Sequence, residues 1–153
     1  MDSPQESFSI WKSSLTTTPA NPKEKFGSAK PPLIQLPLVA VAHASLAHLD
    51  GDLKYGWRNW RDNPVEARTY LNAAMRHLML WNEGEEYTRD TKVNNLGAVI
   101  ACCAILLDAQ ANNGLIDNRS KSQAVCDILH ELEGTVKTLQ EMQAERVAKK
   151  LGT

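Results

Sequence analysis

Cysteine is scarce in this chain of 153 residues, and its placement excludes the sites that cysteine usually builds. Cys102 and Cys103 are adjacent, Cys126 stands apart, and no C-x-x-C spacing occurs. Such a set favours neither a disulfide framework nor a cysteine-rich zinc site. The adjacent pair also lies in an apolar stretch, where a thiol is a poor nucleophile. This usage predicts a reducing, cytoplasmic environment.

An excess of one charge and long apolar runs are also missing. Seventeen basic residues stand against 18 acidic ones, giving a net charge of −1. The chain therefore has no global attraction for nucleic-acid polymers or anionic membranes. The longest apolar run, 96–107, is too short to span a bilayer, and the first residues do not have the pattern of a signal peptide. We expect no membrane and no nucleic-acid polymer among its partners.

Proline divides the chain into two parts, because six of the seven prolines lie in the first 37 residues. Residues 1–30 hold few large apolar side chains, so they cannot bury enough surface to offset the entropy of ordering. We interpret them as a flexible tail. The alternative is a tail that lies over a partner subunit through Phe8 and Trp11. Residues 31–153 have the composition of a helical domain.

Spacing and terminus signals predict two helices in the first half of that domain. One begins at Pro37, whose missing N–H costs nothing in a first turn, and ends at Gly51. The next has Asn63 as its N-cap, Glu66 in a capping box and Gly84 at its end. A polar, aromatic connection joins them.

Two further helices follow, and no β-pattern of useful length appears. An almost wholly apolar helix is expected at 96–111, capped by Asn94 or Asn95, and such a helix belongs in the centre of a bundle. A long helix starting near 118–120 carries an apolar stripe at spacings of three and four. The stripe consists of Val125, Ile128, Leu132, Val136, Leu139 and Met142. The prediction is an all-α four-helix bundle whose long C-terminal helix can pair with another chain in a homo-oligomer.

The connection after the first helix gathers residues that suit a nucleotide. Eight positions hold three cations, two tryptophans, a tyrosine and an asparagine. Cations and amides hold phosphate oxygens, and aromatic faces stack on bases. The candidate binding residues are Lys54, Tyr55, Trp57, Asn59, Trp60 and Arg61. The alternative is that the tryptophans plug the end of the bundle while the cations are solvated.

Arg76 and His77 form a second candidate group, late in the second helix. His77 lies on or beside the buried face, where a histidine is either a hydrogen-bonded structural group or a catalytic one. Arg76 either holds phosphate or pairs with Glu83, which lies seven residues later on the same face.

A third group is acidic and would suit Mg²⁺ or Mn²⁺, which need several carboxylate oxygens close together. The candidate metal ligands are Glu85, Glu86, Asp90 and Asp108. Asp108 is the only ionised residue of the apolar helix, so it must find either a metal or an arginine. The acids at 83–90 have a plainer reading as a solvated loop.

An ordered series of motifs resembles a known family. The motifs are K-P-P-L-x-x-x-P at 30–37, K-Y-G at 54–56, N-W-R at 59–61, R-H-L at 76–78 and G-E at 84–85. Over about residues 30–110 they resemble the phage-borne dATP/dGTP diphosphohydrolase N-terminal domain family, which is similar to MazG-like, all-α nucleotide pyrophosphohydrolases. The resemblance implies an Mg²⁺-dependent split of a nucleoside triphosphate into monophosphate and pyrophosphate. It also implies that His77, Glu85 and Glu86 are catalytic, and that a phage-encoded chain acts in the host cytoplasm.

The chain departs from the family pattern after G-E. Thr88 stands where the pattern has an acid, and Asn95 to Ala98 replace a pair of histidines. Two functions therefore stay open: a metal-dependent (deoxy)nucleoside triphosphate pyrophosphohydrolase, and a non-catalytic phage protein that sequesters a nucleotide signal without metal. A weaker third is a structural oligomer built on the C-terminal helix.

Overall fold

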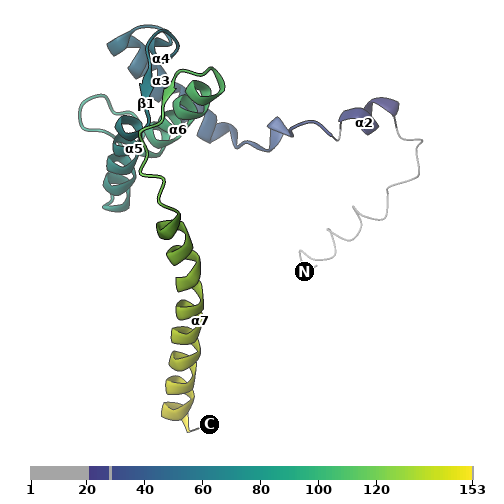
Figure 1. Cartoon of the computed structure of the whole chain (residues 1–153), viewed down its shortest axis with the longest axis vertical. Helices are drawn as coiled ribbons and strands as arrows, with labels where there is room; N and C mark the ends of the chain where they lie inside the picture. The colour runs from purple at the N-terminus through teal and green to yellow at the C-terminus, as the bar shows by residue number, and fades with distance from the viewer. Residues whose placement is uncertain (1–20, 28, 153) are drawn as a thin grey trace, which may run out of the picture.

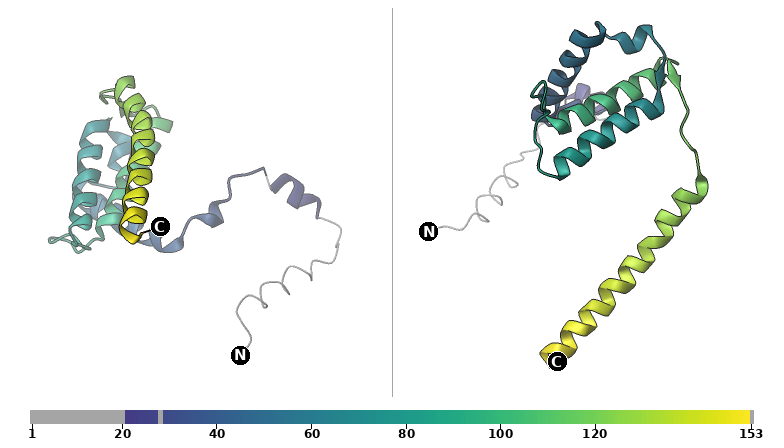
Figure 2. Two further views of the ribbon diagram at one scale, coloured as in Figure 1. Left: turned by 90° about the horizontal axis from the view of Figure 1, so that it is seen from below. Right: turned by 90° about the vertical axis from the view of Figure 1, so that its left-hand side faces the viewer.

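Three packed helices, α3 (Leu38–Tyr55), α5 (Ala67–Asn82) and α6 (Asn95–Ala111), form the central layer of the fold (Figure 1). The computed structural model describes residues 21–27 and 29–152. Within these, α6 packs against both α3 and α5. Figure 2 shows the three helices side by side. The short helices α2 (Pro22–Gly27) and η1 (Leu33–Gln35) precede the layer, and α4 (Asn59–Asp62) follows α3. The proposed contact of Phe8 and Trp11 lies outside the described residues.

Small side chains let the helices of the layer approach closely. The buried apolar residues of the described chain are Ala44, Val65, Ala67, Ala101 and Ala109. Gly97, in the first turn of α6, lies directly against α3. A Cβ atom built there would be 2.7 Å from the backbone oxygen of His43. The α3–α6 crossing therefore depends on a residue without a side chain.

The apolar central helix confirms the sequence prediction, including its cap. α6 begins at Asn95, and the side-chain oxygen of Asn94 accepts a hydrogen bond of 3.1 Å from the Gly97 N–H. This bond satisfies one of the donors left unpaired at a helix start.

Gly51 does not end the preceding helix, so that prediction is wrong. α3 continues through Gly51 to Tyr55 and ends at Gly56, whose φ of 99° is left-handed. A helical glycine costs only about 1 kcal/mol relative to alanine, which the packing of α3 on α6 offsets. The loop residues Lys54 and Tyr55 are thus the last turn of a helix.

The capping box at Asn63 and Glu66 is also wrong, because Asn63 precedes a strand and Glu66 lies within it. β1 (Val65–Glu66) pairs in parallel with β2 (Leu115–Ile116), with Val65 opposite Leu115. The Val65 N–H donates to the Gly114 carbonyl oxygen at 2.9 Å, and helix α5 starts only at Ala67. This pairing ties the start of α5 to the end of α6.

The long C-terminal helix, α7 (Gln123–Leu151), points away from the layer (Figures 1 and 2). Ser122 caps it, so it begins slightly later than expected, and none of its residues is buried. The all-α fold and the long final helix are confirmed. The described chain does not form a four-helix bundle by itself, because its fourth long helix lies apart. None of the described helices could cross a membrane.

Replacing Gly97 by alanine tests the close α3–α6 approach. The added methyl group would meet backbone atoms of α3, so we expect the free energy of unfolding to fall by about 1–3 kcal/mol. Gly51→Ala is the matched control, since nothing lies within 4 Å of its Cβ position; it should gain about 0.5–1 kcal/mol. Urea unfolding measures both. Equal stability of the two variants would contradict the proposed packing.

Candidate active site

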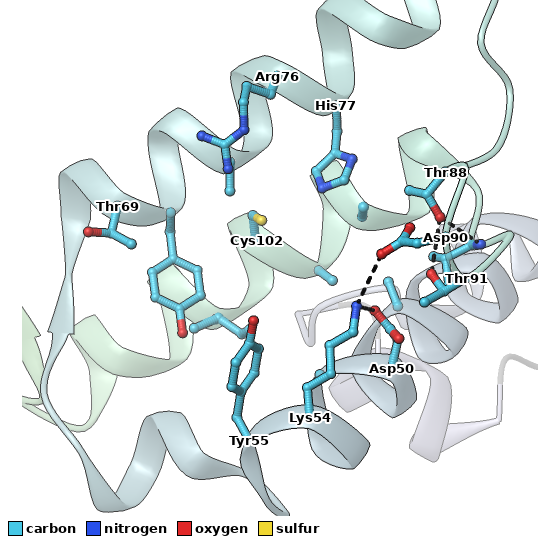
Figure 3. Close-up of a pocket in the computed structure, with 18 of the residues that line it drawn as sticks. Asp50, Lys54, Tyr55, Thr69, Arg76, His77, Thr88, Asp90, Thr91 and Cys102 are labelled. Atoms are coloured by element: carbon cyan, nitrogen blue, oxygen red, sulfur yellow. Dashed lines mark hydrogen bonds and ion pairs between the residues drawn. The ribbon is translucent and has the colours of Figure 1, made fainter.

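A cavity of about 540 Å³ opens between α3, α5, α6 and the loop that joins α5 to α6 (Figure 3). Its size is that of small-molecule pockets in general. Its polar lining comes from separate parts of the chain, with Asp50, Lys54 and Tyr55 from α3, Thr69, Tyr70, Arg76 and His77 from α5, and Thr88, Asp90 and Thr91 from the loop. The predicted residues Lys54, Tyr55, Asn59, Arg76, His77 and Asp90 all line it.

Lys54 is a cation held between two carboxylates. Its Nζ atom lies 2.7 Å from Asp50 Oδ2 and 3.7 Å from Asp90 Oδ2. The hydrogen bond to Asp50 raises the pKa of Lys54, so the ammonium form is favoured. Backbone N–H groups, first that of Thr91, lower the pKa of Asp90. Lys54 therefore links α3 to the loop and carries its charge at one wall of the cavity.

Arg76 lies on the opposite wall and forms no ion pair with any described residue. Figure 3 shows its side chain and that of His77 coming from α5 on the side across from Lys54. The alternative partner, Glu83, instead accepts a hydrogen bond from Asn82 at 2.9 Å. Arg76 is thus a cation of the cavity whose charge is available to a ligand.

His77 is oriented by an asparagine that the site prediction missed. His77 Nδ1 lies 2.8 Å from Asn95 Oδ1, and Asn95 is fully buried. The Asn95 amide nitrogen donates to the Glu85 carbonyl oxygen at 2.6 Å, which fixes the direction of the amide. Because Asn95 Oδ1 can only accept, Nδ1 must carry the imidazole proton. Nε2 is then the ring nitrogen left for the cavity.

Tyr70 is a second lining residue that the site prediction missed. Burial, followed by the neighbouring Cys102 and Tyr55, raises the pKa of its phenol group. Tyr70 and His77 are seven residues apart and therefore share a helix face. That spacing is the signal that could have placed Tyr70 in the site. Asn95 also had a signal in the sequence, because it stands where the family pattern has a histidine.

Trp60, Arg61 and Asp108 lie outside this cavity, and both Trp60 and Arg61 donate hydrogen bonds to Asp108. Trp60 Nε1 donates to Asp108 Oδ2 at 2.9 Å, and Arg61 binds both oxygens of the carboxylate, at 2.9 and 2.6 Å. The Trp60 ring also packs on His48, with the ring centroids 5.2 Å apart. The arginine is thus the partner that Asp108 needed. The cluster joins α4 to α6, which agrees with the structural alternative for this tryptophan.

Trp57 has a different place from Trp60. Its side chain is largely exposed, and the Arg58 guanidinium lies 5.0 Å from the centre of its ring. It does not line the cavity.

The four predicted metal ligands do not come together within the described chain. Asp108 is bound to Arg61, Asp90 faces Lys54, and Glu85 Oε2 accepts from Arg89 Nε at 2.8 Å. Neither Glu85 nor Glu86 lines the cavity. No group of three histidine, cysteine or carboxylate side chains among the described residues is placed to hold a metal ion. The described residues of one chain therefore do not form a ready-made carboxylate cluster for Mg²⁺.

The comparison with protein families matches residues 20–119 to the family described as dATP/dGTP diphosphohydrolase, N-terminal. The match spans well over half of the chain. The chain belongs to this family. The matched family domain contains the whole cavity and ends just before α7. No curated protein and no solved structure matches the chain.

The protonation of His77 can be read from its ring nitrogens. Near pH 8 we expect the neutral imidazole to carry its proton on Nδ1, because Asn95 offers only an acceptor there. Two-bond ¹H–¹⁵N correlation spectra distinguish the two tautomers. A proton on Nε2 in the wild-type protein would contradict the arrangement, and Asn95→Ala should remove the preference for Nδ1.

The Arg61–Asp108 pair predicts a pH-dependent stability. The hydrogen bond from Arg61 holds the pKa of Asp108 below its usual value, so the pair stabilises the folded chain at neutral pH. That contribution is lost as the pH falls through the lowered pKa. Arg61→Gln should therefore lower the urea midpoint clearly at pH 7 and by less at a pH below the lowered pKa of Asp108. A deficit that is equal at both pH values would contradict this role, and Arg89→Gln serves as a surface control.

Proposed function

We propose that this chain binds a purine deoxynucleoside triphosphate in the α3–α5–α6 cavity and hydrolyses it to monophosphate and pyrophosphate. The observation that carries the proposal is the placing of Lys54, Arg76 and an oriented His77 around one cavity of the family domain. The purine bases come from the family description, dATP/dGTP diphosphohydrolase.

The two cations suit the triphosphate. Guanidinium and ammonium groups make charge-assisted hydrogen bonds to phosphate oxygens, and Arg76 has no competing ion pair among the described side chains. On one wall Arg76 would bind phosphate oxygens with its full charge, and on the other Lys54 would use the N–H donor that Asp50 and Asp90 leave free. The two cations would also stabilise the negative charge that develops on the leaving pyrophosphate.

His77 suits the role of general base. In our proposal a water attacks the α-phosphorus, its proton passes to His77 Nε2, and the bond from the α-phosphorus to the bridging oxygen breaks. The hydrogen bond to Asn95 leaves Nε2 with its lone pair and would stabilise the imidazolium that forms.

Two tyrosines suit the base of the nucleotide. Tyr55 and Tyr70 both line the cavity, and aromatic rings bind nucleobases by stacking. We propose them for this role in place of Trp57 and Trp60, which lie elsewhere.

A second candidate function is nucleotide binding without turnover. The absence of a gathered acid cluster among the described residues favours it, since cations and aromatic rings bind a nucleotide without metal. The two candidates differ in their need for Mg²⁺ or Mn²⁺. In the enzyme the metal has to arrive with the triphosphate or be bound by residues of more than one chain.

We also propose that the protein acts as a homo-oligomer in a reducing cytoplasm. Met75, Leu78 and Met79 leave about half of their surface exposed along α5, and apolar surface of this kind is commonly covered by a partner. The three cysteines are free thiols.

Pyrophosphate release tests the function directly. The four deoxynucleoside triphosphates are incubated separately with the protein and Mg²⁺ or Mn²⁺, and we expect turnover of dATP or dGTP. Arg76→Ala should lower kcat/KM by about 10²–10³-fold, because it removes a charged contact to the transition state. Arg89→Ala is the matched control, since its side chain is exposed and lies outside the cavity.

The outcomes separate the two candidates. If no nucleotide is turned over but dATP or dGTP binds tightly in EDTA, the protein binds nucleotide without hydrolysing it, and the second candidate function holds. Absence of both turnover and binding would overturn the nucleotide site altogether.

A further inference from the structure

Helix α7 is a part of the molecule that the family domain does not include. The family match ends at residue 119, and α7 starts at Gln123. Its apolar residues at 125, 129, 132, 136 and 139 follow alternating spacings of four and three, the seven-residue repeat of a coiled coil. All five have exposures between 48% and 64%. The helix therefore carries a coiled-coil stripe that none of the residues described by the structure covers.

We propose that α7 pairs with α7 of a second copy as an antiparallel coiled coil. The helix has 29 residues and is about 43 Å long at 1.5 Å per residue. The strict repeat covers 125–139, about two of the helix's four heptads, and Met142, Val147 and Leu151 extend the exposed apolar surface to its end. Antiparallel pairing would cover the first half of each stripe with the exposed apolar residues from the later half of the other copy's helix.

The charge pattern of the helix selects the antiparallel direction. Residues 123–136 contain three acids, Asp127, Glu131 and Glu133, and no lysine or arginine. Residues 137–151 contain four cations, Lys137, Arg146, Lys149 and Lys150, against two acids. A parallel pair would place acidic half against acidic half, whereas an antiparallel pair places acidic half against basic half.

The exposed apolar residues fit the same direction. Val147 and Leu151 lie near the end of the helix, while Val125 and Leu129 lie near its start. Antiparallel pairing sets these two groups against each other. Because each layer joins the start of its α7, the two cavities would lie at opposite ends of the rod and stay open (Figures 1 and 2).

Light scattering on the full chain tests whether α7 holds two copies together. Leu132→Asp combined with Val136→Asp should halve the mass of the assembly. The layer should stay folded, since neither residue is buried. His130→Asp combined with Thr138→Asp is the control, because it adds the same charge on the far side of the helix and should leave the mass unchanged. An unchanged mass for the Leu132/Val136 variant would overturn the proposal and point to other exposed faces, such as α5.

Charge reversal tests the direction of the pairing. Arg146→Glu with Lys149→Glu should raise the dissociation constant of the dimer about tenfold or more at low salt, and adding Glu131→Lys with Glu133→Lys should restore it. Failure of the second pair to restore binding would overturn the antiparallel arrangement.

The native Cys126, which is an exposed free thiol, gives an independent check. A parallel pair would bring the two copies of Cys126 together, so a Cys126–Cys126 disulfide under mild oxidation would also overturn the direction. Antiparallel pairing predicts that this bond is not formed. The light-scattering, charge-reversal and oxidation experiments are all independent of nucleotide turnover.

Discussion

The close approach of α6 to its two neighbours is the constraint on which the rest of the structure depends. It requires small residues where the helices cross, and Gly97 meets the backbone of α3 so closely that no side chain fits. Because α6 lies between α3 and α5, it fixes the distance between the wall that carries Lys54 and the wall that carries Arg76 and His77. The shape of the cavity thus follows from the packing of the layer.

The sequence predicts those parts of the fold that depend on local signals. The apolar run and the Asn94 cap identify α6, and the stripe identifies α7. Gly51 gives a wrong helix end because the packing of α3 on α6 outweighs the low helix propensity of one glycine. The helix ends instead at Gly56, five residues later, which takes the left-handed conformation. The β1–β2 pair joins residues some 50 positions apart in strands of two residues, too short to leave a periodic pattern.

The candidate site, like the fold, could be predicted only in part from the sequence. Lys54 is predictable from the run of cations and aromatic residues at 54–61, and Arg76 and His77 from their position on the second predicted helix and in the R-H-L motif. Trp60 and Arg61 have the same chemistry but bind Asp108 outside the cavity, and only the fold shows which cations line it. The role of Asn95 is hidden from sequence reasoning because it depends on two partners, His77 and the Glu85 carbonyl group.

The central claim is that nucleotide binds between α3, α5 and α6. The most direct measurement is a ¹H–¹⁵N titration with dATP or dGTP that follows the Arg76 guanidinium, the His77 ring and the indole N–H groups of Trp57 and Trp60. Our account predicts large shifts for Arg76 and His77, with the Trp60 indole unchanged in its bond to Asp108. Shifts centred on the two indoles, with Arg76 and His77 unaffected, would contradict it.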